Sequence, residues 1–294
     1  MEGPATNSPM SPVGLAVDKG GNIYVADSAG YVEKITPDGY LWVVAGNGVT
    51  DGAPSPGPAE ASPIAPVGIA VDGAGDLLVA DKNGYIERIT PAGQLSVIAG
   101  VKQDFYSFPP VEGPASKSPL FPTSVAVDGA GNVFVGDRHG YIAKITPGGT
   151  LSFFAGTGDY GGGHRDRGPV PALQSSIYPA GLAIDLAGNV YVANGVIDKI
   201  TPGGVLTVVA GNGTTGFPVP GPAVDSYLAA DGLAVDRVGT LYLADLGNID
   251  QVTVDGVLSI VAGTGDGHDA PDIQHPPVAG PATDSPMRPV AVAV

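Results

Sequence analysis

The chain of 294 residues has no cysteine, little positive charge and few aromatic side chains. Without cysteine, no disulfide can stabilise the fold, and thiol catalysis and thiolate metal sites are excluded. Only 13 Lys and Arg residues stand against 29 Asp and Glu residues, so the formal net charge is −16. Such a charge repels nucleic-acid phosphates and anionic membrane surfaces, so we expect neither nucleic acid nor membrane as a partner.

Long hydrophobic runs are also missing. No apolar run reaches the length of a membrane-spanning helix. The first ten residues, MEGPATNSPM, have neither the basic region nor the apolar core of a secretory signal peptide. The residues by themselves therefore indicate no targeting segment.

Glycine and proline are abundant, with 46 and 29 residues. Without periodicity, this composition would be typical of low-complexity or disordered chains. Here both residues recur in register between short segments rich in Val, Ile, Leu and Tyr, which indicates strands joined by tight turns.

A repeat organises the whole chain. The segment VGLAVD at 13–18 recurs as VGIAVD, TSVAVD, AGLAID and DGLAVD, with closing Asp residues 51 to 57 positions apart, and it returns as VAVAV at 290–294. In each unit three more strand-like segments follow, such as NIYVAD, YVEKIT and LWVVAG in the first. Four short antiparallel strands make one propeller blade. We therefore predict an all-β fold, a β-propeller of four-stranded antiparallel blades.

Five blades are favoured, and a six-bladed or incomplete six-bladed ring is the alternative. The chain is expected to form one domain over residues 1–294. The segment GPATNSPMSPVGLAV near the start is nearly repeated by GPATDSPMRPVAVAV at the end, which supports closure of the ring. We expect the last segment to pack at the seam beside the first blade, in a monomer. The repeats span about 3–56, 57–112, 113–171, 172–220 and 221–279, followed by a closing partial repeat at 280–294.

The unit P-x-G-(I/L)-A-V-D-x-x-G-N-(I/V)-Y-V-A-D, followed by K-I-T-P-x-G, V-A-G-x-G and G-P-A, resembles the NHL repeat, in its long-connector bacterial form. The resemblance covers residues 3–294. It implies a propeller that acts as an interaction domain in an extracellular or periplasmic location. One departure is that NGYI, HGYI or AGYV stands where the family has N-N-R-I, so the usual basic position is Tyr or absent.

Two faces of the ring are expected to differ. The VDGAGN and TPGG turns fall on one face, and the second turn of each blade falls with the long connectors on the other, which we call the long-loop face. Loops on a rigid scaffold often carry function, so we place a binding site there. One candidate is a set of connector aromatics, either an exposed platform for a sugar or peptide or a cover for an apolar seam: Phe105, Tyr106 and Phe108.

A second candidate is the main basic cluster of this acidic chain. It is either an anion or carboxylate site built on Arg side chains or a solvated, self-paired charge run. Its residues lie in the blade-three turn and in the connector at 156–171: Arg138, His139, Tyr160, His164, Arg165 and Arg167.

We predict no cofactor and no metal. The connector at 263–279 holds weak candidates for divalent-metal ligands, but their spacing matches no known ligand motif: His268, Asp269, Asp272 and His275. Two sets of Asp residues recur in nearly every blade, and this regularity favours capping of turns over calcium binding: Asp18, Asp72, Asp128, Asp185 and Asp236, and Asp27, Asp81, Asp137 and Asp245.

The function favoured by the sequence is a non-catalytic binding scaffold for a protein, peptide or glycan at the long-loop face. The alternative is a metal-dependent propeller hydrolase or lyase similar to gluconolactonases. The four His residues, at 139, 164, 268 and 275, all lie in expected turns or loops, which does not favour an enzyme. A further alternative is a designed or reconstructed propeller without a natural ligand.

Overall fold

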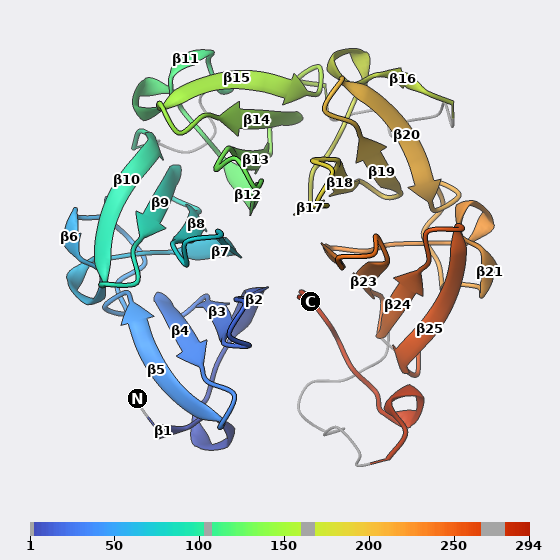
Figure 1. Ribbon diagram of the computed structural model, residues 1–294, viewed down its shortest axis with the longest axis horizontal. Helices are drawn as coiled ribbons and strands as arrows, with labels where there is room; N and C mark the ends of the chain where they lie inside the picture. The colour runs from blue at the N-terminus through green and yellow to red at the C-terminus, as the bar shows by residue number, and fades with distance from the viewer. Residues whose placement is uncertain (1–2, 103–107, 160–167, 266–279) are drawn as a thin grey trace.

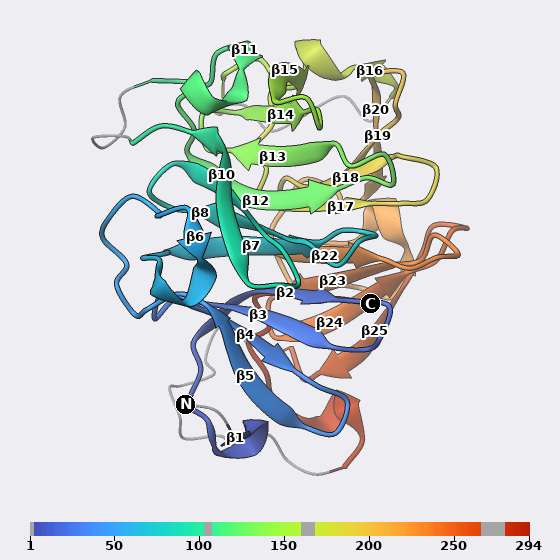
Figure 2. The ribbon, with the colours of Figure 1, turned by 60° about the vertical axis from the view of Figure 1, so that its left-hand side comes forward.

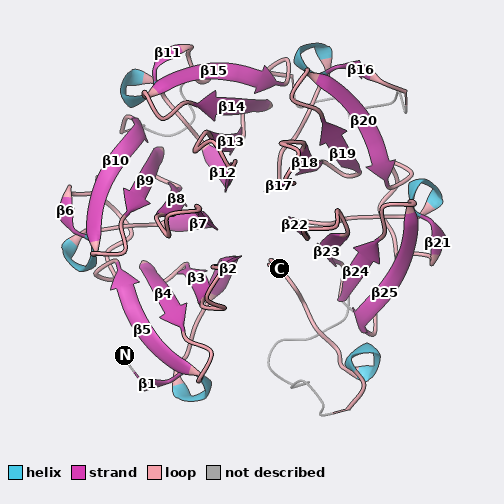
Figure 3. Cartoon of the chain, in the orientation of Figure 1, coloured by secondary structure: helices cyan, strands magenta, loops and turns pink. Residues whose placement is uncertain are grey.

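The computed structural model describes residues 3–102, 108–159, 168–265 and 280–294. It confirms an all-β propeller with five blades, each an antiparallel sheet, arranged around a central axis (Figure 1). Figure 3 shows that helix is limited to single short turns at the rim. The four longer strands of each blade run from the axis outward in chain order, as expected for strands joined by tight turns.

Four strands of each blade are the predicted ones. In blade one they are β2 (Pro12–Val17), β3 (Ile23–Asp27), β4 (Tyr31–Ile35) and β5 (Tyr40–Ala45). In blade two they are β7 (Pro66–Val71), β8 (Leu77–Asp81), β9 (Tyr85–Ile89) and β10 (Gln94–Gly100). In blade three they are β12 (Pro122–Val127), β13 (Val133–Asp137), β14 (Tyr141–Ile145) and β15 (Thr150–Ala155).

Blades four and five repeat this plan. Blade four contains β17 (Gly181–Ile184), β18 (Val190–Ala193), β19 (Ile197–Ile200) and β20 (Val205–Ala210). Blade five contains β22 (Gly232–Val235), β23 (Leu241–Asp245), β24 (Asn248–Val252) and β25 (Val257–Gly263). The turns between β4 and β5 and between their equivalents end on a glycine with positive φ, such as Gly39 at 81°, which side chains with a Cβ adopt only with strain.

The prediction of four strands per blade was wrong in one respect, because each sheet has a fifth. It is a two-residue strand that pairs antiparallel with the outermost strand of the same blade, as Gly3 does with Leu41. These strands are β1 (Gly3–Pro4), β6 (Gly57–Pro58), β11 (Gly113–Pro114), β16 (Val170–Pro171) and β21 (Gly221–Pro222). They shield part of an edge that would otherwise expose unpaired backbone groups.

A short 3-10 helix follows each of these strands and turns the chain inward. The helices are η1 (Ala5–Asn7), η2 (Ala59–Ala61), η3 (Ala115–Lys117), η4 (Ala172–Gln174) and η5 (Ala223–Asp225), and η6 (Ala282–Asp284) precedes the C-terminal segment. Proline has no N–H to continue the pairing and its fixed φ suits the start of a helical turn, so the Gly-Pro-Ala motif explains both the short strand and its end.

The core is divided into layers between neighbouring blades. Between blades one and two, Ala26, Val32, Ile64 and Val79 are fully buried in one apolar cluster. Similar clusters lie between blades two and three, three and four, and four and five. Each blade therefore buries its faces mainly against its neighbours, which is how a propeller stabilises sheets that could not fold alone.

Six segments surround the axis, although five carry complete sheets. A central channel of about 80 Å³ is lined by three consecutive residues from each segment. The middle residues are Gly14, Gly68, Ser124, Gly181, Gly232 and Ala291. Residues 289–294 thus hold the innermost position of a sixth sector, between blade five and blade one, where Figure 1 places the C-terminus.

This arrangement refines the prediction of ring closure. Five sheets form the ring, as favoured, and the last segment lies at the seam beside the first blade, as expected. Ile23 of blade one is 38% exposed, whereas its equivalents Leu77, Val133, Val190 and Leu241 are at most 4% exposed. Within the described residues, the flank of blade one that faces the sixth sector is therefore less covered than the same flank of the other blades.

Candidate functional site

The two predicted faces are present. In Figure 2, the connector that follows β5 projects on the side of the ring opposite the turn between β2 and β3. Connectors and second turns contact each other, since the side-chain amide of Asn83 donates to the carbonyl of Thr50 at 3.0 Å and Gly48 N–H donates to the carbonyl of Gly30 at 3.3 Å. The long-loop face is therefore a continuous layer of loops across neighbouring blades.

Three predicted site residues of this face belong to the described part of the chain: Phe108, Arg138 and His139. Phe108 is 65% exposed. Phe105, Tyr106, Tyr160, His164, Arg165 and Arg167 lie outside the described residues, as do the weak metal candidates His268, Asp269, Asp272 and His275. Their proposed roles stay predictions.

The blade-three turn brings Arg138 and His139 together around a buried carboxylate. Asp137 Oδ1 accepts a hydrogen bond from His139 N–H at 2.9 Å and lies 2.8 Å from His139 Nδ1, while its Oδ2 accepts from Phe121 N–H at 2.7 Å. The Arg138 guanidinium lies over the Phe121 ring, 5.4 Å from its centroid. The turn is thus rigid, and the exposed Arg138 presents a cation on an aromatic support.

The tyrosine that departs from the family pattern has a structural role. Tyr141 stacks on Phe153, with ring centroids 4.4 Å apart and an interplanar angle of 20°. Its hydroxyl donates to the carbonyl of Thr157 at 3.3 Å and lies directly against Gly158, where a Cβ would come within 2.2 Å of it. This tyrosine therefore supports the connector, which explains why a basic residue is absent at this position.

The first recurring set of Asp residues caps turns, as predicted. Asp18 Oδ1 accepts hydrogen bonds from the N–H groups of Gly20 and Asn22 at 2.8 and 3.0 Å, and its Oδ2 accepts from the Asn22 amide and the Tyr24 hydroxyl. Partial burial acts to raise the pKa of Asp18, but these hydrogen bonds outweigh it, and the pKa is lowered. The other blades repeat the pattern, as Asp185 shows.

The second set caps the other turn. Asp81 accepts hydrogen bonds from Ala65 N–H at 2.8 Å and from Asn83 N–H at 2.6 Å. The carboxylates of this set therefore also stabilise loops.

A buried acid on the third strand accompanies the second set, and sequence reasoning missed it. Glu87 lies beside Asp81 and is fully buried, and burial together with the Asp81 charge raises its pKa well above the usual range. In blade five, burial and the Asp245 charge raise the pKa of Asp250 to about 8. The signal was an acidic residue at the same place in YVEKIT, YIERIT, VIDKI and NIDQVT.

The described residues around the axis offer few groups for acid–base chemistry or metal binding. Asp231 is the one ionisable residue among the described residues that line the central channel. The described part of the chain contains no group of three or more His, Cys, Asp or Glu residues that could hold a metal ion. No helix in the described ranges is long and apolar enough to cross a membrane.

A groove between blades one and two is the other feature that sequence reasoning missed. Its volume is about 550 Å³, and Tyr24, Lys34, Trp42 and Glu60 contribute to its lining. The signal was a break in the repeat: the fourth strand reads LWVV in blade one and carries Ser or Thr at the position of Trp42 in all others.

Comparison with known proteins connects the repeat to a family. The family model of the NHL repeat matches residues 10–30, which cover β2, its turn and β3, and this unit recurs in every blade. The chain contains an NHL repeat within a five-bladed β-propeller. This NHL propeller is 29% identical over 287 residues to mouse (Mus musculus) Teneurin-3; the match covers 87% of the chain but about a tenth of that protein's length.

Solved structures share the fold of the NHL propeller at low identity. Virginiamycin B lyase from Staphylococcus aureus is 18% identical with a TM-score of 0.51, covering 88% of this chain and 72% of that one. A gluconolactonase from Xanthomonas campestris is 17% identical with a TM-score of 0.56, covering 86% and 75%. An auxiliary nutrient binding protein from Bacteroides ovatus is 13% identical with a TM-score of 0.59, covering 90% and 60%. Since enzymes and a binding protein share this fold, the site must be argued from its residues.

Proposed function

We propose that the NHL propeller is a non-catalytic binding scaffold. The observation that carries this proposal is the lining of the central channel, which consists mostly of Gly, Ala, Val, Leu and Ile positions with Asp231 as its one ionisable group in the described chain. A catalytic centre on the axis needs acids, bases or metal ligands from several blades that converge on one point. The residues at this position instead pack blades together.

The carboxyl groups elsewhere in the ring support the same conclusion. Asp18 and Asp81 use their oxygens to accept backbone N–H groups of their own turns. Glu87 and Asp250 have the raised pKa of a general acid, but both are fully buried within a sheet. A general acid must come within hydrogen-bond reach of its substrate, and these side chains have no access to one.

The long-loop face supplies a surface for a protein, peptide or glycan ligand. Its described part presents Arg138 on Phe121 and the exposed Phe108. Arg and aromatic side chains are enriched among residues that dominate binding energies. The hydrogen bonds of the Asp137–His139 turn hold the backbone of Arg138, which reduces the entropy lost on binding.

Thermal melting tests the non-catalytic part of the proposal. We expect the same melting temperature in EDTA and in millimolar Ca²⁺ or Zn²⁺, because a metal that binds only the folded state would raise it. Turnover of lactone substrates should be absent under each condition. A shift of several degrees with one metal, joined by lactone hydrolysis that EDTA abolishes, would instead establish the gluconolactonase-like alternative.

A glycan and peptide array, followed by titration of each hit, tests the binding part. A ligand of the long-loop face should bind Arg138→Ala at least about tenfold more weakly, since charge-assisted hydrogen bonds are worth about 1.5–3 kcal/mol. Arg237→Ala is the matched control, because Arg237 is exposed in the turn between β22 and β23 on the opposite face. Equal loss in both variants would show that net charge, not this face, determines binding.

A further inference from the structure

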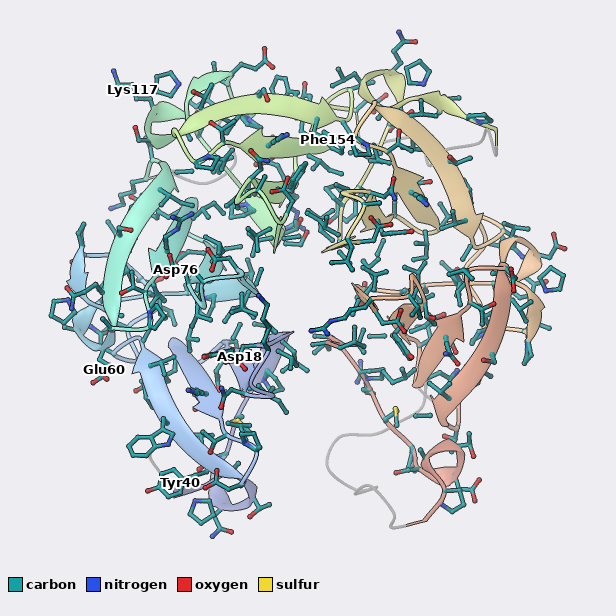
Figure 4. All side chains as sticks on the ribbon, viewed as in Figure 1. Asp18, Tyr40, Glu60, Asp76, Lys117 and Phe154 are labelled. Atoms are coloured by element: carbon teal, nitrogen blue, oxygen red, sulfur yellow. The ribbon has the colours of Figure 1, made fainter. Side chains whose placement is uncertain are left out.

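The groove between blades one and two exposes the one tryptophan of the chain. Trp42 lies on β5, the outer strand of blade one, and is 44% exposed. Its ring centroid is 5.0 Å from that of Tyr40. Figure 4 labels Tyr40 and Glu60 on the outer rim, on blade one and at the start of blade two. Trp42 lines the groove, and an exposed amphipathic ring in a groove is suited to ligand contact.

Two residues of the groove, Trp42 and Glu60, differ from the residues at the same positions of the other repeats. The position of Trp42 is Ser96, Ser152, Thr207 and Ser259 in the other blades. The position of Glu60 on η2 is Ser, Leu or Val at the start of blades three, four and five. A structural requirement of the blade would recur in every unit, as the turn-capping Asp residues do. The blade fold therefore does not require Trp42 and Glu60, and we relate both residues to this groove.

The groove also carries one charge of each sign. The Lys34 ammonium lies over the Tyr24 ring, 5.9 Å from its centroid, and this packing recurs for Lys144 and Lys199 in other blades. Glu60 is exposed on the opposite wall. Neither Lys34 nor Glu60 forms a salt bridge within the described residues. The ammonium remains a hydrogen-bond donor and the carboxylate an acceptor for a ligand.

We propose that this groove binds a neutral carbohydrate, with a sugar ring against Trp42 and hydroxyl groups hydrogen-bonded to Lys34 and Glu60. The inference rests on the proposed binding function and narrows it to a ligand class and a second site. The volume of about 550 Å³ falls in the range of small-ligand sites, about 300–1,000 Å³. A cationic ligand would meet Lys34 and an anionic one Glu60, whereas hydroxyl groups can both accept from the ammonium and donate to the carboxylate.

Intrinsic fluorescence gives a direct measurement, because Trp42 is the sole tryptophan. We would titrate the whole chain with short neutral gluco-, xylo-, galacto- and manno-oligosaccharides and confirm hits by calorimetry. We expect a shift in Trp42 emission with at least one of these series. Binding measured by calorimetry should weaken at least tenfold in Trp42→Ser and in Glu60→Ser, and Trp42→Phe should retain part of it.

Matched controls separate the outcomes. The serine variants carry residues found at the same positions in other blades, so they should melt as the wild type does. Leu186→Ser, an exposed apolar residue in the turn between β17 and β18, should leave saccharide affinity unchanged. Saccharide binding that survives Trp42→Ser would refute the groove as its site. If only peptides bind, or no saccharide shifts the emission, the carbohydrate proposal is wrong while the scaffold proposal stands. Metal-dependent turnover would instead overturn the scaffold proposal itself.

Discussion

The buried carboxyl pair of blade five predicts that removing one charge stabilises the protein in alkaline solution. Asp245 and Asp250 are at most 1% exposed, and burial followed by the Asp245 charge raises the pKa of Asp250 from 3.8 to about 8. The folded state therefore keeps a proton that the unfolded state releases near pH 4. Stability from this pair is fully present below about pH 4 and is lost as the pH rises through about 8.

The expected size follows from the same two pKa values. One pH unit of difference corresponds to about 1.4 kcal/mol, so ionising Asp250 costs the folded state on the order of 5 kcal/mol. Asp250→Asn removes this ionisation and gives Asp245 Oδ2 an amide donor. Blade four contains an amide–carboxylate pair with the two positions reversed, since the Asn194 amide, at the position of Asp245, donates to Asp198 Oδ2 at 3.1 Å. Allowing for imperfect fit of the new amide, we expect a gain of about 2–4 kcal/mol at pH 9.

Chemical denaturation at pH 4.5, 7 and 9 is the assay. The difference between Asp250→Asn and wild type should be small at pH 4.5 and grow toward pH 9. Asp255→Asn is the control, because Asp255 is an exposed turn residue of the same blade and carries the same change of charge. Equal stability of Asp250→Asn and wild type at pH 9, or an equal gain in Asp255→Asn, would refute the assignment of this proton to the buried pair.

The remaining predictions concern the axis and the turns. Gly232→Ala places a Cβ 2.9 Å from Ala291 Cα and should destabilise the fold by about 1–3 kcal/mol in urea denaturation, whereas Gly129→Ala, with open space around its Cβ, should change stability by less than about 1 kcal/mol. A similar cost for both variants would contradict close packing at the axis. Asp185→Ala removes the acceptor of Ala187 and Asn189 N–H groups and should cost about 1–3 kcal/mol at pH 7. Burial acts to raise the pKa of Asp185, but its hydrogen bonds outweigh burial and lower the pKa. The stability that the Asp185 carboxylate contributes is therefore present above about pH 4 and lost at lower pH. A cost of Asp185→Ala that does not depend on pH would show that the charge plays no part.

Much of the fold could be predicted because each unit repeats its strand and turn signals. The segment from Pro12 to Asp27 alone shows two strands, an Asp cap and a glycine turn, and four more copies remove the ambiguity of a short window. The short Gly-Pro strands could not be predicted in this way, because Gly and Pro are depleted in strands and only the neighbouring β5 or its equivalent makes them pair.

The candidate sites were harder to predict, for a different reason. Glu87 looks like a solvent-facing residue within YIERIT, but it is fully buried, and its pKa is raised by burial and by Asp81, which comes from another strand. The groove at Trp42 forms because η2 of the next blade lies opposite Trp42. Alternation along one strand shows which residues share a face, but not which partner that face meets. The number of sectors likewise depends on the packing of six segments at the axis.

The two-residue rim strands also determine how such a ring can gain or lose blades. Each pairs with the outer strand of its own repeat, so all five strands of a sheet come from one continuous stretch of about 55 residues. An in-frame duplication cut just ahead of one of these two-residue strands would add a whole sheet without separating the paired strands of any sheet. The natural module of this chain therefore begins at the rim rather than at the axis, and blades can be gained, lost or exchanged as intact units.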